Sequence, residues 1–123
     1  MISYVTLGAS NLATAKAFYS ELLSDLGAKV LIDMDRICFF GKSMAAPMLA
    51  VCTPFNGEPA TEGNGTMVAF APGSKEGVDA LYNKAIALGA SCEGAPGERI
   101  PNVFYGAYVR DRDGNKLCFN HFI

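Results

Sequence analysis

The 123-residue sequence predicts an α+β fold of two β-α-β-β-β modules, whose strands form a curled mixed sheet shaped as an open half-barrel. Three observations carry this prediction. Strand and helix patterns occur in the same order in both halves of the chain, the halves share short sequence matches, and a strong hairpin signal closes the chain. Because each helix has one apolar face to bury, each module is expected to pack its helix against its own strands.

The first module is expected within residues 1–55. A strand-like run over Met1–Leu7 leads to Asn11, whose side chain can cap a helix by accepting a backbone N–H bond. Apolar residues then recur at helical spacing as far as Gly27, which tolerates the positive φ that follows a helix end. Three short strands are expected next, at Ala28–Asp33, Arg36–Gly41 and Pro47–Thr53.

The second module is expected within residues 65–123, after a polar linker at 56–64 that is rich in Gly and Pro. Its first strand is predicted at Gly65–Ala71, and Ser74 can cap a helix that ends at Gly89. The linker joins the modules within one 123-residue domain.

The rest of the second module is predicted to end on a hairpin. Asp113-Gly114 is typical of a tight turn, because Gly accepts positive φ and Asp tolerates it. A short strand and a loop are expected before the hairpin, at Ala90–Glu93 and Gly94–Asn102, and the hairpin strands at Val103–Arg110 and Asn115–Phe122.

Two sequence matches indicate an internal duplication. Leu26-Gly27-Ala28 recurs as Leu88-Gly89-Ala90, 62 residues later. Ala17-Phe18-Tyr19 recurs as Ala80-Leu81-Tyr82, 63 residues later. The nearly equal offsets, within matching strand and helix contexts, favour a repeat of about half the chain.

Composition excludes several function classes. The net charge is −2 and there is no basic stripe, so a nucleic-acid partner is not expected. No apolar run approaches the ~18 residues of a membrane span, so no membrane partner is expected, and the N-terminus lacks the features of a secretory signal. The four cysteines have no zinc-module spacing, which favours free thiols in a cytoplasmic protein.

The closing hairpin resembles that of the vicinal oxygen chelate superfamily, which includes glyoxalase I, bleomycin-resistance proteins and extradiol dioxygenases. The family hairpin usually reads V-x-D-P-D-G-N-x-[LI]-E, and here the run is Val109-Arg-Asp-Arg-Asp-Gly-Asn-Lys-Leu-Cys118. The resemblance extends over the whole chain and includes Phe18-Tyr19 in the first helix. A ferredoxin-like α+β dimer is the rival architecture, and it accounts less well for three strands after the first helix.

The resemblance also implies where a divalent metal would bind. Metal-dependent members place a His on the first strand, a His or Glu on the fourth, a His at the start of the fifth and a Glu on the last. By strand pattern these positions are Tyr4, Ala50, Thr66 and Cys118. None offers an imidazole or a carboxylate, so neither a metal nor another cofactor is expected. The single histidine, His121, has the opposite strand parity from Cys118.

A pocket of mixed polarity is expected instead. Arg110 would suit a carboxylate or phosphate, and either Tyr105 or Tyr108 enters the pocket. The alternative is that these side chains only fill a small core. The candidate ligand-binding residues are Tyr4, Thr66, Tyr108, Arg110, Cys118 and Asn120, with Thr6, Cys38, Phe40, Val68 and Phe70 as further lining.

Three function classes remain open. The first is a metal-independent protein that binds a small-molecule ligand, with a cavity in each sheet, and forms a homodimer as family members commonly do. The second is an enzyme with a non-standard site, either a lyase related to glyoxalase I (lactoylglutathione lyase) or a dioxygenase-like member, whose catalytic residues are unknown. The third is a structural or regulatory dimer. The residue types at the four metal positions favour the first class.

Overall fold

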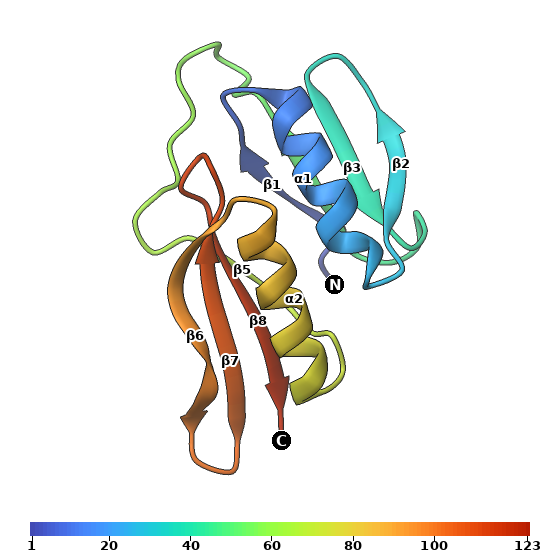
Figure 1. Cartoon of the computed structure of the whole chain (residues 1–123). Helices are drawn as coiled ribbons and strands as arrows, with labels where there is room; N and C mark the ends of the chain where they lie inside the picture. The colour runs from blue at the N-terminus through green and yellow to red at the C-terminus, as the bar shows by residue number, and fades with distance from the viewer. The chain divides into compact units, whose positions relative to one another are not determined.

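Each half of the chain folds as a β-α-β-β-β module in the computed structural model, which describes residues 1–123 (Figure 1). The contacts divide the chain into an N-terminal unit, Met1–Glu62, and a C-terminal unit, Gly63–Ile123. The predicted α+β fold of two modules is therefore confirmed. Neither helix has the length and apolar content that crossing a membrane requires.

The N-terminal unit contains a four-stranded mixed sheet in the order β1-β4-β3-β2. Strand β1 runs parallel to β4, and the β4–β3 and β3–β2 pairs are antiparallel. The elements are β1 (Tyr4–Gly8), α1 (Leu12–Ser24), β2 (Lys29–Asp33), β3 (Ile37–Gly41) and β4 (Met48–Cys52).

The C-terminal unit repeats this topology. Its sheet has the order β5-β8-β7-β6, with β5 parallel to β8 and the other two pairs antiparallel. The repetition agrees with the duplication read from the sequence. The elements are β5 (Met67–Phe70), α2 (Lys75–Ala87), β6 (Ser91–Ile100), β7 (Phe104–Arg110) and β8 (Lys116–Phe122).

Both helices begin at the residues that the sequence indicated, and α2 ends just before Gly89 as expected, whereas α1 ends at Ser24 with Asp25 as its C-cap, slightly earlier than Gly27 indicated. Asn11 Oδ1 accepts a hydrogen bond from the Thr14 amide at 3.0 Å, and Ser74 Oγ accepts one from the Gly77 amide at 2.9 Å. Each such cap stabilises its helix by about 1 kcal/mol. Just after the helix ends, Gly27 and Gly89 have φ values of 76° and 103°, which a residue with a Cβ adopts only with strain.

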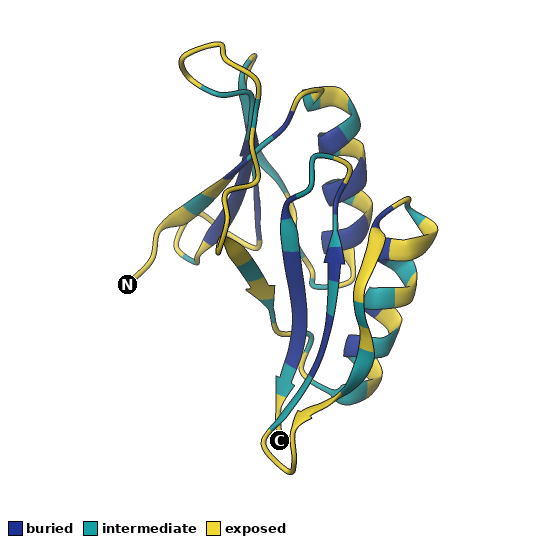
Figure 2. Cartoon of the chain, turned by 90° about the vertical axis from the view of Figure 1, so that its left-hand side faces the viewer, coloured by how far each residue is buried: buried dark blue, intermediate teal, exposed yellow.

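Each core lies between a helix and one face of its own sheet, where the buried segments of helix and central strands meet (Figure 2). In the N-terminal unit the α1 side chain of Tyr19 packs on Phe40 of β3, with ring centroids 6.4 Å apart. Apolar burial of this kind is the main source of stability. The buried core side chains include Leu7, Phe18, Tyr19, Leu22, Phe40, Leu49 and Val51 in the first unit and Val78, Leu81, Ala107, Val109, Leu117 and Phe119 in the second.

One strand prediction was wrong. Residues Ser91–Ile100 form a single ten-residue strand, β6, where a strand over Ala90–Glu93 and a loop over Gly94–Asn102 were expected. The register of β6 against β7 shifts three times, including between Gly94 and Gly97. These irregularities let the strand accommodate Pro96, which has no N–H to donate to a ladder. Glycine and proline therefore mark bulges here and not a loop.

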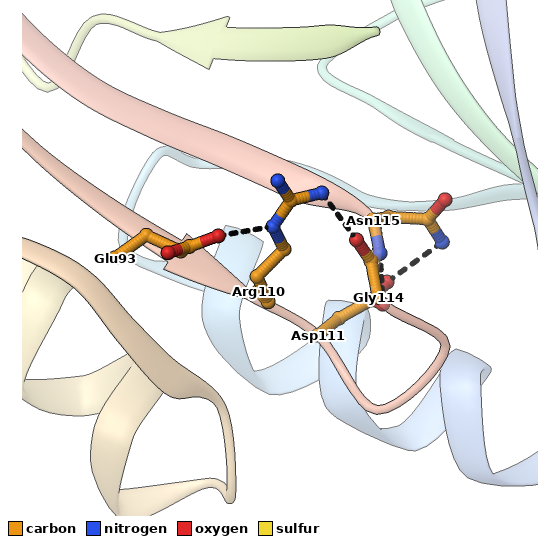
Figure 3. A network of polar contacts seen from close by, with 5 residues as sticks. All are labelled: Glu93, Arg110, Asp111, Gly114 and Asn115. Atoms are coloured by element: carbon orange, nitrogen blue, oxygen red, sulfur yellow. Dashed lines mark hydrogen bonds and ion pairs between the residues drawn. The ribbon is translucent and has the colours of Figure 1, made fainter. Parts of the chain in front are cut away.

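The predicted turn between β7 and β8 is held by one buried carboxylate, that of Asp111 (Figure 3). Asp111 Oδ1 accepts hydrogen bonds from the amides of Asp113 and Asn115, both at 2.9 Å. Its Oδ2 accepts a further bond from Asn115 Nδ2 at 3.0 Å. A side chain that satisfies backbone donors in this way substitutes for regular pairing within the turn.

Replacing this carboxylate should weaken the hairpin. We expect Asp111→Ala to lower the free energy of unfolding by about 1–3 kcal/mol, because three donors lose their acceptor. Urea denaturation followed by circular dichroism measures the change. The matched control is Asp35→Ala in the β2–β3 turn, where the residue is exposed; its effect should stay within about 0.5 kcal/mol. Equal effects of the two substitutions would contradict this role of Asp111.

A second polar contact joins α2 to its sheet. The Tyr105 hydroxyl on β7 donates a hydrogen bond to Asp79 Oδ1 on α2 at 2.6 Å. This bond, more than partial burial, raises the pKa of Tyr105 above its ordinary value. The unfolded chain therefore loses the phenolic proton at a lower pH than the folded chain. The stabilisation is complete below about pH 10 and is lost as the pH rises through the folded-state pKa.

Tyr105→Phe tests this linkage. At pH 7.5 the substitution should lower the free energy of unfolding by about 0.5–1.5 kcal/mol, and the difference from the unmodified chain should shrink above about pH 10. Chemical denaturation at several pH values measures it. The control Tyr4→Phe removes an exposed hydroxyl that forms no hydrogen bond within the chain. A Tyr105→Phe difference that stayed constant to pH 11 would show that the bond does not stabilise the protonated phenol.

Candidate functional site

Each sheet has one face that packs on its own helix and a second face, the open face, that this helix does not reach. Alternation along a strand sends successive side chains to opposite faces, so the core residues of each strand identify the other side. In the N-terminal unit, Tyr4 and Phe39 lie on the open face with their ring centroids 4.9 Å apart. The N-terminal open face consists of Tyr4, Thr6, Ile37, Phe39, Met48, Ala50 and Cys52.

The open face of the C-terminal unit is more polar. Tyr108 on β7 lies opposite Cys118 on β8, and Arg110 lies opposite Lys116. Cys118 also lies opposite Ala69 on β5, so these three strands share one face at this level. The C-terminal open face consists of Met67, Ala69, Tyr108, Arg110, Lys116, Cys118 and Asn120.

Four of the six candidate site residues lie together on the C-terminal open face, namely Tyr108, Arg110, Cys118 and Asn120. Tyr4 lies on the open face of the other unit. Thr66 is exposed and precedes β5, whose first residue is Met67. Met67 and Ala69 have the parity that points to the open face, so the strand begins one residue later than the predicted metal position.

Some of the expected lining residues face the cores instead, and this part of the prediction was wrong. Phe40 and Cys38 are almost fully buried on the α1 side of their sheet. Phe70 has the parity of Val68 and contacts Phe119 on the α2 side. Their apolar side chains suit a core as well as a pocket lining. The parity of Cys38 and Phe40 became certain only once the pairing register of β3 was known.

The two tyrosines that the sequence offered as alternatives for the pocket lie on opposite faces of the C-terminal sheet. Tyr105 points to α2, where its hydroxyl bonds Asp79, whereas Tyr108 lies on the C-terminal open face. His121 lies opposite Tyr105 and therefore has the parity that points to the helix side, as its spacing from Cys118 predicted.

Two cations that the sequence reading did not include lie over the Tyr108 ring. Arg99 Cζ is 5.5 Å from the ring centroid and Lys116 Nζ is 5.3 Å from it. Both distances are within the range of a cation–π interaction. Lys116 could have been found by strand alternation, since it precedes Cys118 by two residues. Arg99 could not, because its segment was read as a loop.

Arg110 is held by contacts within its own module (Figure 3). Its Nε donates to Glu93 Oε1 at 2.5 Å, and its Nη1 donates to the Gly114 carbonyl at 2.9 Å. The hydrogen bond from Arg110 lowers the pKa of the Glu93 carboxyl. Arg110 therefore links β6, β7 and the turn, and its charge is balanced by Glu93.

The thiol and phenol at the centre of the C-terminal open face are both neutral at physiological pH. Burial raises the pKa of Cys118, which is 1% exposed, and the Tyr108 hydroxyl and nearby cations only partly oppose this effect. Burial likewise raises the pKa of Tyr108. A protonated thiol is a poor metal ligand and a poor nucleophile, and a protonated phenol is a hydrogen-bond donor.

The residues at the metal positions do not suit a divalent ion. The strand positions are occupied by Tyr4, Ala50, Met67 and Cys118, with Thr66 just before β5. These side chains bring no carboxylate or imidazole to offset dehydration of the ion. No three side chains of His, Cys, Asp or Glu in the chain are grouped so that they could hold a metal.

A pocket of about 370 Å³ lies elsewhere in the N-terminal unit, between the β1–α1 turn and the loop after β4. None of the candidate site residues lines it. Its lining consists of Ala9, Ser10, Thr53, Pro54, Gly57, Glu58, Pro59 and Ala60.

Comparison with known proteins gives the chain's relationships. The family model described as "Glyoxalase/Bleomycin resistance protein/Dioxygenase superfamily" matches residues 1–119. The structure of a glyoxalase/bleomycin resistance protein from Albidiferax ferrireducens T118 is 40% identical, with a TM-score of 0.90, and the match covers 100% of this chain and 99% of that one. A search of curated proteins found no match.

More distant structures share the fold. A glyoxalase/bleomycin resistance protein/dioxygenase family enzyme from Burkholderia phytofirmans PsJN is 23% identical, with a TM-score of 0.80 and 98% of each chain covered. A lactoylglutathione lyase from Agrobacterium tumefaciens is 24% identical, with a TM-score of 0.70, and the match covers 98% of this chain and 92% of that one. With the family match over nearly the whole sequence, these findings show that the chain belongs to the glyoxalase/bleomycin resistance protein/dioxygenase superfamily.

Proposed function

We propose that this chain is a metal-independent protein that binds a small molecule on the open faces of its sheets. The observation that carries the proposal is the composition of the C-terminal open face. Cys118 and Asn120 form its buried floor, and Tyr108 lies beside Cys118, so a thiol, an amide and a phenol occur together without a carboxylate or imidazole at the metal positions. Polar groups placed beside apolar side chains, here Met67 and Ala69, are typical of ligand sites.

The N-terminal open face supports the same proposal. Tyr4, Phe39 and Ile37 offer aromatic and aliphatic surface, with the hydroxyl of Thr6 on the same side. Each sheet therefore has a surface that could contact a ligand: apolar in the first unit and mixed in the second. The enzymatic alternative, a lyase or dioxygenase-like activity with a non-standard site, is less well supported, because burial raises the pKa of the Cys118 thiol and neither an imidazole nor a carboxylate occupies the metal positions.

Ligand screening after metal removal tests this function. Chelated protein is screened by thermal shift against small aromatic and thiol compounds, and each hit is repeated with EDTA and with added Zn²⁺, Ni²⁺, Mn²⁺ or Fe²⁺. Hits should stabilise the chain equally in all conditions, by roughly 2.7 kcal/mol at a hundredfold excess over Kd. Saturable binding of one metal per chain, abolished by Cys118→Ala, would overturn the metal-free proposal and favour the enzymatic alternative.

A pair of buried cysteines provides a matched control for the location of the site. Cys118 and Cys38 are 1% and 0% exposed, but Cys118 lies on an open face and Cys38 on the α1 side. Both Ala substitutions leave small cavities of similar cost. Only Cys118→Ala should weaken binding of the hits. Equal loss with Cys38→Ala would indicate that the effect comes from stability and not from the site.

We also propose that the protein is a homodimer. The apolar side chains of the N-terminal open face are not covered by α1, and closed two-fold dimers are the commonest assemblies. Sedimentation velocity at micromolar concentration should show a species of twice the 13.0 kDa chain mass. A single species at the mass of one chain would exclude the dimer.

A further inference from the structure

Three neighbouring strands bring two cations and a phenol together on the C-terminal open face. Arg99 comes from β6, Tyr108 from β7 and Lys116 from β8, and both cations lie within 5.5 Å of the centroid of one ring. Two like charges beside the same ring repel each other, and the ring offsets only part of that cost. A negatively charged group bound beside the two cations would therefore stabilise the arrangement.

No carboxylate of the chain lies within ion-pair distance of either cation. Neither Arg99 nor Lys116 forms an ion pair, and the Arg99 guanidinium donates only to the Ala95 carbonyl. Glu93 is bound by Arg110, and the charge of Lys116 also helps to lower the pKa of that carboxyl, so one carboxylate serves this face, which has three cations, Arg99, Arg110 and Lys116. The face therefore carries uncompensated positive charge although the whole chain has a net charge of −2. Local charge of this kind raises the local concentration of anions.

The backbone of β6 makes room for the cluster. A Cβ at Gly94 would lie 3.0 Å from Arg99 Nη2 and 3.1 Å from Tyr108 Cδ2. The lack of a side chain at this position lets the guanidinium lie over the ring. Gly94 is thus a positioning residue for Arg99, and its effect can be tested without removing either charge.

We propose that Arg99, Lys116 and Tyr108 form an anion subsite, and that the ligand is a small organic anion with a carboxylate or phosphate group. This inference rests on the proposed ligand-binding function and names the class of its ligand. The guanidinium and ammonium bind the anionic group, and the Tyr108 hydroxyl is a neutral hydrogen-bond donor on the same face. An arginine fork suits the two oxygens of a carboxylate or phosphate.

Titration with three probes of similar shape tests the charge requirement. Benzoate, phenyl phosphate and benzamide are added to isotope-labelled protein, and the resonances of Tyr108, Lys116 and Cys118 are followed by two-dimensional NMR. Benzoate or phenyl phosphate should move these resonances saturably, with a Kd at least tenfold below that of benzamide. The ratio between the two anions distinguishes a carboxylate ligand from a phosphate ligand.

Substitutions then assign the subsite to its residues. Arg99→Met and Lys116→Met should each weaken binding of the better anion at least threefold. Gly94→Ala should also weaken it, although both charges remain. The matched control is Lys75→Met, because Lys75 Nζ lies 5.6 Å from the centroid of the Tyr105 ring, on the helix side of the same sheet. Binding to Lys75→Met should stay within twofold of the unmodified protein.

Failure of the subsite is distinguishable from failure of the binding function. Benzamide binding as tightly as the anions, with no effect of Lys116→Met, would overturn the anion subsite and leave a ligand site in place. If the three probes move no resonance but hits from the thermal-shift screen do, the anion subsite is again wrong and the ligand site remains. If neither probes nor hits move the open-face resonances, both the subsite and the proposed function are wrong.

Discussion

The docking of one helix on one face of each sheet determines where every other side chain of the module points. Side chains alternate along a strand, so once Leu117 and Phe119 pack towards α2, Cys118 and Asn120 must point to the other face. The same holds for Phe40 and Phe39 around α1. A slip of one residue would exchange the core for the open face, and the apolar side chains of the core oppose such a slip. The chemistry of each open face is therefore fixed by the packing behind it.

Much of this arrangement could be predicted from the sequence because the signals were local. Asn11 and Ser74 indicated the helix starts, Gly27 and Gly89 the helix ends, and Asp113-Gly114 the closing turn. The prediction that was wrong, a loop after residue 93, concerned a segment whose structure depends on pairing with another strand. Gly94 and Gly97 belong to bulges only because β7 pairs beside them, and without that partner the segment has the composition of a loop.

The candidate site was likewise predicted where the signal was local and missed where it depended on strand pairing. Strand spacing correctly grouped Cys118 with Asn120 and Tyr108 with Arg110, since these pairs lie two residues apart. Thr66 was predicted within a strand over Gly65–Ala71, but β5 begins at Met67, because strand ends are the least certain part of a prediction from sequence. Arg99 was missed because its position over Tyr108 depends on the irregular register of β6. The polar groups and Arg110 were thus available from the sequence, whereas the two further cations over Tyr108 were not included.

The bulges of β6 also affect whether two copies of the chain can pair through the edges of their sheets. Strand β6 is an edge of its sheet, and β2, the equivalent edge of the first unit, has a register shift between Val30 and Ile32. A straight edge offers a regular row of backbone donors and acceptors on which another chain can build a strand. The irregular register and Pro96 interrupt that row in β6. Strand-to-strand aggregation through this edge is therefore disfavoured.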